Sequence, residues 1–235
     1  MVWDDYCTQF LEEYSNPEYN EASRKRFQEM TERIVPAILE RKNSISQLDA
    51  EWFTQALEDE QRKWFVAFAF GRMEYVPENL FEPMIRAAVY ERNPSANRRF
   101  IDPCLSAFGH RRVNEVLFTF LESGSDFEKA GAVNAFYWAQ DVKTIAEHKA
   151  MTDIWIKKQF RFLQEFVSNE DIQVRRSLIA NLDLDPQDYP AELRSTVNQA
   201  IQIARAHSDD YIRHRVEVQL GTGTEGLLKP LPYRK

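Results

Sequence analysis

The sequence is poor in the residues that mark disulfide-bonded, metal-binding or membrane-spanning proteins. It contains two cysteines in 235 residues, which is too few for a disulfide framework or a cysteine metal cluster. Cys7 and Cys104 each lie among apolar residues, so we predict two buried free thiols. The longest aromatic-rich apolar run, residues 64–70, is too short to cross a bilayer. No signal peptide is recognisable, and we expect a cytoplasmic protein.

Glycine is also scarce. Seven glycines are present, against sixteen Phe, nine Tyr and five Trp. A low glycine content together with many Glu, Arg, Ala, Leu and Phe residues favours helix over sheet. Val and Ile recur at helical spacing and do not alternate with polar residues as they do in strands. We therefore predict an all-α protein.

The chain has no excess of positive charge. Its formal net charge is −7, and residues 1–60 hold 14 of the 37 acidic residues but 6 of the 30 basic ones. Because affinity for phosphate polyanions depends on Lys and Arg, nucleic acid is not an expected partner. The acidic first sixty residues indicate either a basic partner surface or a contribution to solubility alone.

One phrase of the sequence occurs twice, thirty-eight residues apart, at 171–182 and 209–220. Each copy opens with an Asp, continues with a β-branched residue and an Arg at +3 and +4, and places aliphatic residues at +7 and +11. This spacing puts the apolar residues on one face of a helix. A repeat of about forty residues is typical of proteins built from stacked helix pairs.

Apolar spacing and turn residues predict the helices along the chain. The predicted segments are 4–14, 17–41, 47–57, 58–73, 77–93, 95–108, 111–122, 126–140, 145–167, 171–182, 191–206 and 209–220. The second segment continues to residue 41 unless Pro36 kinks or interrupts it. Capping boxes are predicted at Ser15 and Ser125, and Gly109 is predicted to end a helix.

The two phrases resemble HEAT repeats, and the PBS-lyase type of HEAT-like repeat among them; residues 126–133 are a more divergent copy. The resemblance covers residues 58–220 and implies an α-solenoid, a right-handed superhelix of antiparallel helix pairs. We place an acidic N-terminal helical cap at 1–57, HEAT-like repeats at 58–220 and a tail at 221–235, in one continuous domain. The tail either docks on the last helices or serves as a peptide ligand.

Arginine doublets and a Trp–Asp pair are the candidate binding residues. We predict that a solenoid surface uses Arg98, Arg99, Arg111, Arg112, Trp138, Asp141 and Arg175. Arginine suits this role because its planar fork binds a carboxylate or phosphate through two hydrogen bonds. The alternative interpretation is structural, with repeated arginines binding carboxylates or helix-end carbonyls of the neighbouring repeat.

Adjacent aromatic residues supply a second kind of candidate. Most aromatic side chains must lie between helices, because each helix pair buries its apolar face against the next. Successive residues of a helix point about 100° apart, so some of Trp52, Phe53, Tyr137 and Trp138 should reach the surface or a second interface, unless the core is wider and two-sided. Exposed Trp and Tyr are typical binding anchors.

The sequence favours a non-catalytic scaffold or adaptor with a protein partner, and we assign no catalytic residue, metal or cofactor. The histidines lack metal-ligand spacing, and the GxGxxG match at 221–226 follows a helix where the dinucleotide motif needs a strand. Two alternatives stay open. The resemblance allows an enzyme or chaperone acting on a bound cofactor, as in bilin lyases. Trp138 and Asp141 loosely resemble the pair of the HEAT-like alkylpurine DNA glycosylases.

Overall fold

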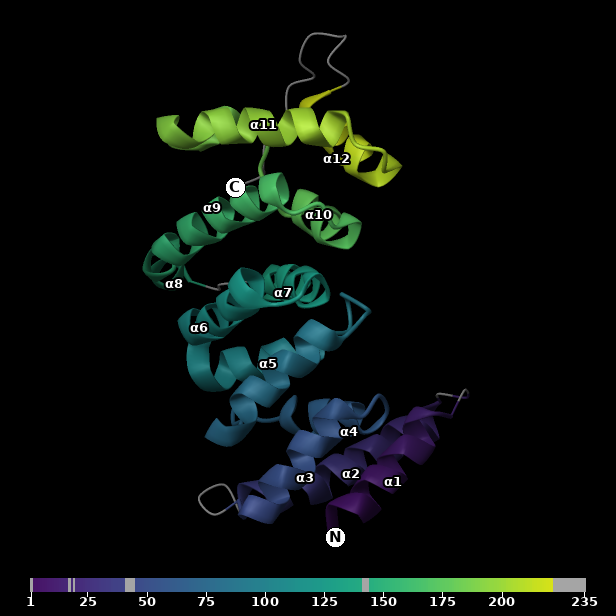
Figure 1. The fold of residues 1–235 in the computed structure, drawn as a ribbon. Coiled ribbons are helices and arrows are strands. Elements are labelled where there is room, and N and C mark those ends of the chain that lie inside the picture. Colours follow the sequence, from purple (N-terminus) through teal and green to yellow (C-terminus); the bar gives the residue numbers. More distant parts are fainter. Residues whose placement is uncertain (1, 17, 19, 41–44, 141–143, 222–235) are drawn as a thin grey trace. The chain divides into compact units, whose positions relative to one another are not determined.

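The computed structural model describes residues 2–16, 18, 20–40, 45–140 and 144–221. These residues form helices and no strands (Figure 1), which confirms the all-α prediction. None of the described helices is long and apolar enough to cross a membrane. The α-helices are α1 (Val2–Tyr14), α2 (Glu21–Leu39), α3 (Gln47–Glu58), α4 (Arg62–Phe70), α5 (Phe81–Tyr90), α6 (Arg98–Ser123), α7 (Asp126–Ala139), α8 (Ile145–Ala150), α9 (Thr152–Ser168), α10 (Ile172–Ile179), α11 (Arg194–Arg205) and α12 (Asp210–Leu220). Short 3-10 helices are η1 (Glu78–Leu80), η2 (Pro186–Asp188) and η3 (Ala191–Leu193).

The chain divides into two compact units. The first contains residues 1–117 and 138–140, and the second contains residues 118–137 and 141–235. The division into a cap, a repeat region and a tail within one domain stays a prediction. Residues 222–235 of the tail lie outside the described residues.

The first unit has an aromatic core. Helix α1 packs against α2 and α4, and α3 packs against α4 and α5. Phe53 and Phe65 are fully buried between these helices. At the α1–α3 contact, Trp52 Nε1 donates a hydrogen bond to Asp4 Oδ1 at 2.8 Å. This contact places Trp52 and Phe53 in the core and leaves them unavailable as surface anchors.

Residues 138–140 complete the first unit by closing over the second half of α6. The Ala139 carbonyl accepts hydrogen bonds from His110 Nδ1 at 2.9 Å and from Asn114 Nδ2 at 3.3 Å. Asn114 is almost fully buried, so its amide needs a partner inside the protein. Asn114 Nδ2 has two such partners, the Ala139 carbonyl and the His110 carbonyl, which accepts at 2.8 Å.

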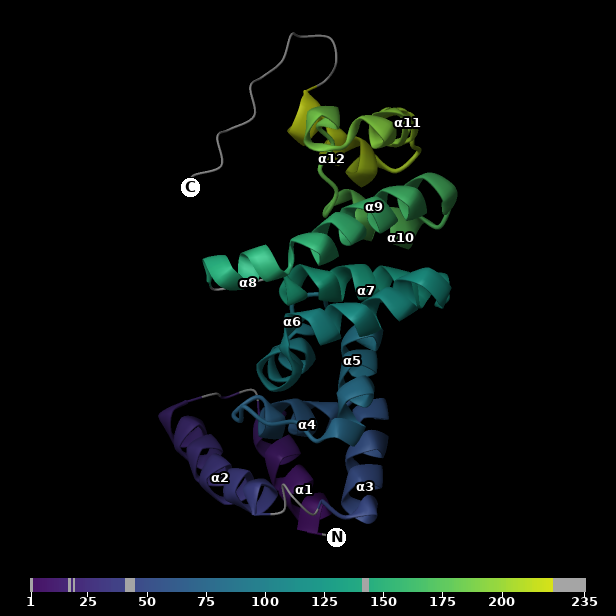
Figure 2. The same cartoon turned by 90° about the vertical axis from the view of Figure 1, so that its left-hand side faces the viewer.

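The second unit is built from helices that contact one another in two rows. Helix α9 packs against α11, and α10 packs against α12 (Figure 2). Phe136, Phe162 and Phe166 are buried in this unit, and the Phe136 and Phe162 rings meet edge to face with centroids 5.4 Å apart. This contact joins α7 to α9, and the burial of apolar surface between helices stabilises the unit.

Both copies of the repeated phrase form the same local structure. Asp171 Oδ1 caps α10 by accepting the Val174 N–H at 3.0 Å, and Asp209 Oδ1 caps α12 by accepting the Ile212 N–H at 3.1 Å. In each copy, the residue two positions before the Asp also accepts the backbone N–H of that Asp. The Asp of the phrase therefore begins each helix, as the sequence predicts.

Two predicted helix boundaries are confirmed. Glu128 Oε2 accepts the Ser125 N–H at 2.9 Å, and Ser125 Oγ accepts the Glu128 N–H at 3.4 Å, which completes the predicted capping box. Gly109 interrupts α6 with φ 79° and ψ 163°. Glycine reaches this conformation readily because it has no Cβ.

Two other predictions about boundaries are wrong. The capping box at Ser15 does not form, because α2 begins later and Asn20 caps it by accepting the Ser23 N–H. From there α2 continues through Pro36 to Leu39. The predicted helix at 145–167 is divided into α8 and α9 at Met151, where φ is −104° and ψ is 0°.

Candidate functional site

Two of the predicted binding residues meet on the first unit. The Arg98 guanidinium lies 5.0 Å from the Trp138 ring centroid, within the range of a cation–π contact. Trp138 Nε1 donates a hydrogen bond to the Pro94 carbonyl at 2.8 Å, which fixes the indole ring. Arg98 Nε also donates to Asp102 Oδ2 at 2.9 Å. The partly exposed Trp138 ring is thus bound at its edge by the Pro94 carbonyl and at its face by Arg98.

Arg99, the next residue of α6, extends this surface toward α4. Its guanidinium lies 5.9 Å from the Trp64 ring centroid, and the Trp64 ring stacks on Tyr14 at a centroid distance of 6.2 Å. Both arginines are exposed, as is 42% of Tyr14. We call this set the Arg99 surface: Tyr14, Trp64, Arg98, Arg99, Asp102 and Trp138.

A cavity of about 560 Å³ opens beside Arg99. Its walls come from α1, α2, α4, α6 and the segments that follow α1 and α4. We call it the Arg99 pocket, lined by Phe10, Glu13, Tyr14, Asn16, Phe27, Ala67, Phe68, Gly71, Arg72, Arg99, Asp102 and Pro103. Its volume lies within the range usual for sites that bind small molecules or side chains.

Aromatic rings form the floor of the Arg99 pocket. The Phe10 ring centroid lies 4.9 Å from that of Phe68 and 5.9 Å from that of Phe27. Arg72 covers one ring, because its guanidinium is 3.8 Å from the Phe68 centroid and its Nη1 donates to the Phe68 carbonyl at 3.0 Å. The pocket therefore combines an apolar floor with a cationic wall.

The charges of the pocket are unequally neutralised. Arg26 and Arg98, which lie outside its walls, pair with Glu13 at 2.5 Å and with Asp102 at 2.9 Å. Arg99 makes no ion pair or hydrogen bond through its side chain in the described part of the chain. Arg26 and Arg98 thus neutralise the Glu13 and Asp102 carboxylates, and no carboxylate in the described part of the chain pairs with Arg99.

The arginines at 111 and 112 lie elsewhere on the first unit. Arg112 is hydrogen-bonded to both carboxylate oxygens of Glu78, and its guanidinium lies 4.6 Å from the Phe81 centroid. Arg111 is exposed in the second half of α6 and is not among the residues that line the Arg99 pocket. Asp141, the predicted partner of Trp138, lies outside the described residues.

Arg175 makes the kind of contact that the structural interpretation predicts. It lies in the second unit, and its Nε donates to the Phe166 carbonyl in the last turn of α9 at 3.4 Å. At the equivalent place in the other copy, Arg213 donates to the His207 carbonyl. Both arginines bind a carbonyl at or just beyond the end of the preceding helix, which leaves their guanidinium groups engaged within the fold.

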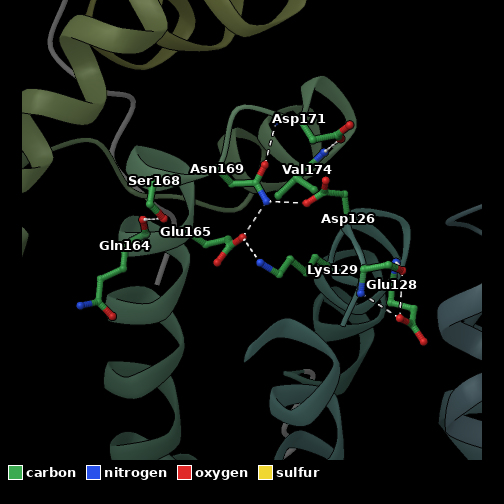
Figure 3. A network of polar contacts seen from close by, with 10 residues as sticks. Asp126, Glu128, Lys129, Gln164, Glu165, Ser168, Asn169, Asp171 and Val174 are labelled. Carbon is green, nitrogen blue, oxygen red and sulfur yellow. Dashed lines mark hydrogen bonds and ion pairs between the residues drawn. The ribbon is translucent and has the colours of Figure 1, made fainter. Parts of the chain in front are cut away.

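A polar network also links the helices of the second unit (Figure 3). Asn169 Nδ2 donates to Asp126 Oδ1 at 2.7 Å and to Glu165 Oε1 at 2.8 Å, and Lys129 pairs with Glu165 at 2.6 Å. The Asn169 side chain also accepts the Asp171 N–H through Oδ1. These residues join α7, the end of α9 and the start of α10, so their role is structural.

A second cavity, of about 610 Å³, lies beside this network between α6, α9 and α11. Its charged groups are engaged with each other or with nearby lysines. Glu122 pairs with Arg161 at 3.1 Å and with Lys157 at 3.5 Å, and Glu165 pairs with Lys129. Since these charges are already satisfied, the Arg99 pocket is the stronger candidate.

Groups with shifted pKa values lie away from both cavities. Burial raises the pKa of Cys7 to about 11 and also raises the pKa of Cys104, so the predicted buried thiols are confirmed. Burial lowers the pKa of Lys158 to about 8. No group of three or more metal-binding side chains is found among the described residues.

Sequence reasoning named Arg98, Arg99 and Trp138 but missed the other half of the site. Tyr14, Glu13 and Arg72 come from α1 and from the segment after α4, and no local spacing connects them with residue 99. One signal was present: Arg72 follows Phe68 by four residues, a spacing that would place the cation beside the aromatic ring in the helix predicted at 58–73.

The Arg99 surface and its pocket combine aromatic and cationic side chains on the first unit and are the candidate binding site. Searches with this chain found no matching family model, no matching curated protein and no matching solved structure.

Proposed function

We propose that this chain is a non-catalytic protein-binding scaffold, and that a partner protein binds at the Arg99 surface. One observation carries the proposal: two exposed arginines contact aromatic rings there, Arg99 the Trp64 ring that stacks on Tyr14 and Arg98 the Trp138 ring. Trp, Tyr and Arg are the residues most enriched in the energetically dominant parts of protein interfaces. Their rings are held in place by stacking and hydrogen bonds, which lowers the entropy lost on binding.

We further propose that the scaffold is a HEAT-like α-solenoid. Two features of the second unit support this. Helices in equivalent positions contact each other, α9 with α11 and α10 with α12. The two copies of the repeated phrase also make the same capping and arginine contacts. Repeat proteins are stabilised by such recurring contacts between neighbours.

The alternatives of a cofactor enzyme and a DNA glycosylase gain no support from named residues. Trp138 uses its indole N–H to bind the Pro94 carbonyl and its ring to contact Arg98. The aromatic pocket is ringed by two carboxylates as well as two arginines, which does not favour a phosphate backbone.

Affinity purification of the tagged chain from its native host, with chemical cross-linking and mass spectrometry, tests the proposal. We expect a stoichiometric protein partner whose cross-links fall on α1, α4 and α6. Arg98→Glu and Trp138→Ala should each reduce its recovery, because both change the surface without entering the core. Arg205→Glu is the matched control, since Arg205 is exposed on α11 in the second unit.

Two results would contradict the scaffold. One is the absence of any protein partner under cross-linking. The other is a partner that is retained equally by wild type, by both surface variants and by the control, with its cross-links confined to the second unit.

A further inference from the structure

The aromatic floor of the Arg99 pocket is complementary to an apolar side chain. Phe10 and Phe68 are buried, with 2% and 9% of their surface exposed, so the apolar surface open to an occupant comes from the partly exposed Phe27 and from Tyr14. Since these rings already pack against one another, they form a preformed surface and not a gap that collapses when empty. A large aliphatic or aromatic side chain placed there would displace water from apolar surface, which favours binding.

The arginine wall of the Arg99 pocket is complementary to a negatively charged group. Glu13 and Asp102 are neutralised by Arg26 and Arg98, while Arg99 makes no ion pair in the described part of the chain. Arg72 adds a second guanidinium to the lining. The pocket is therefore locally cationic although residues 1–60 are strongly acidic, and an arginine fork binds a carboxylate through charge-assisted hydrogen bonds.

One side chain at the pocket also lacks a donor. Glu13 Oε1 binds Arg26 Nε, but Glu13 Oε2 is buried and has no hydrogen-bond partner among the described residues. A buried acceptor without a partner is uncommon and costs stability. Because this oxygen is shielded from solvent in the structure, an N–H group of an occupant would reach it after a rotation of the Glu13 carboxylate.

We infer that the Arg99 pocket binds an extended acidic segment of the partner protein, with one large apolar side chain on the aromatic floor and a neighbouring Asp or Glu on Arg99. The inference rests on the proposed function. A peptide carries both the apolar and the acidic group, and its backbone has N–H groups for Glu13 once that carboxylate turns toward the pocket. It is favoured over a small aromatic carboxylate because the Arg99 surface continues outside the pocket from Asp102 through Arg98 to Trp138, and neither Arg98 nor Trp138 lines the pocket.

Selection of a random-sequence peptide library displayed on phage against the full chain tests the inference. We expect the enriched peptides to place Asp or Glu next to Phe, Tyr, Trp, Leu or Ile. Synthetic copies of these peptides, measured by fluorescence anisotropy, should lose roughly tenfold or more in affinity when the apolar residue is changed to Ala or the acid to Lys. Their affinity should fall with added salt, because the contact is ionic and near the surface.

Variants of the chain locate the site. Arg99→Ala should weaken the selected peptides roughly tenfold, and Tyr14→Ala should also weaken them. Arg99 is exposed and lies outside the core, whereas Tyr14 stacks on the buried Phe10, so thermal unfolding of Tyr14→Ala is measured beside wild type. Arg205→Ala removes an exposed arginine of the second unit and should leave binding unchanged.

Three outcomes would overturn the inference: no enriched sequence, enrichment of basic peptides, or acidic peptides whose binding ignores Arg99→Ala. Competition by phenylacetate without any peptide selection would assign the pocket to a small molecule instead. If a host partner is still captured through Arg98 and Trp138 in these cases, the scaffold stands and the acidic-segment inference alone fails. If neither a partner nor a peptide is found, both fail.

Discussion

Replacement of Lys63 by methionine is expected to destabilise the first unit by about 3 kcal/mol. The Lys63 ammonium lies 2.7 Å from Glu60 and 2.9 Å from Glu91, with 8% of the Lys63 side chain and 9% of the Glu91 side chain exposed. Methionine keeps the length of the aliphatic stem but removes the charge. The Glu91 carboxylate is then buried without its cation, and breaking a buried pair in this way costs roughly 3–5 kcal/mol.

The lower end of that range applies because the third member of the cluster is close to water. Glu60 is 83% exposed, so it partly rehydrates when Lys63 is lost. For the same reason Glu60→Gln should cost less than about 1 kcal/mol. Glu91→Gln should fall between the two, at about 2 kcal/mol, because Lys63 keeps Glu60 as a partner.

The charge state of Lys63 does not change this order. Burial acts to lower the pKa of Lys63, but hydrogen bonds to Glu60 and Glu91 outweigh burial and raise the pKa above its ordinary value. Lys63 is therefore cationic throughout the neutral range. The loss measured at pH 7 is the loss of an ion pair.

Urea unfolding, followed by far-UV circular dichroism, gives the free energy of unfolding of the three variants. In a thermal scan, a loss of about 3 kcal/mol would lower the midpoint temperature of a unit of this size by roughly 10 °C. The double variant Lys63→Met/Glu91→Leu replaces the pair by apolar groups and should recover most of the loss. A Lys63→Met variant within about 1 kcal/mol of wild type, or a Glu60→Gln variant as costly as Glu91→Gln, would refute the reasoning.

Three further predictions concern helix ends. Asp171→Ala removes one helix cap and should lower the free energy of unfolding by about 1 kcal/mol. Asp209→Ala should lower it further, because the Asp209 carboxylate also binds Arg176 of α10. Equal losses of the two variants in urea unfolding would contradict this. Burial, followed by nearby arginine charge, lowers the pKa of His207 from 6.5. The unfolded chain then binds the proton more readily, so stability is full above that value and falls as the pH drops below it. His207→Asn should remove this dependence, and an unchanged pH profile would argue against it. Gly109→Ala should cost roughly 1–3 kcal/mol from backbone strain, since a Cβ would meet nothing within 4 Å; a neutral change in thermal unfolding would show that the backbone relaxes.

Helix boundaries were predictable where a side chain binds the backbone within three residues of itself. Ser125, Asp171 and Asp209 are such cases, because the capping hydrogen bond depends on local sequence alone. Prediction failed at the start of α2, where Ser15 and Asn20 both offer a cap and the later one is used. It also failed at Met151, where neither Pro nor Gly marks the break between α8 and α9.

The candidate site was predictable only in part, because its halves meet through tertiary contacts. Residue types pointed to Arg98, Arg99 and Trp138 as binding residues. Their contacts with each other and with Tyr14 and Trp64 join segments far apart in the chain. Periodicity reports which face of a helix is buried, but it does not report which distant helix supplies the neighbouring side chain.

The return of residues 138–140 to the first unit has a consequence for how the protein is made. The buried Asn114 amide and the Arg98 side chain acquire Ala139 and Trp138 as partners only after the intervening segment 118–137 has been synthesised. Domains generally fold in order as they leave the ribosome. Here the first unit is complete only when residues 138–140 have been made, which is after synthesis of the second unit has begun at residue 118. A fragment ending at residue 117 would therefore expose the Asn114 amide and lack one edge of the Arg99 surface, whereas a fragment ending at residue 140 would keep both.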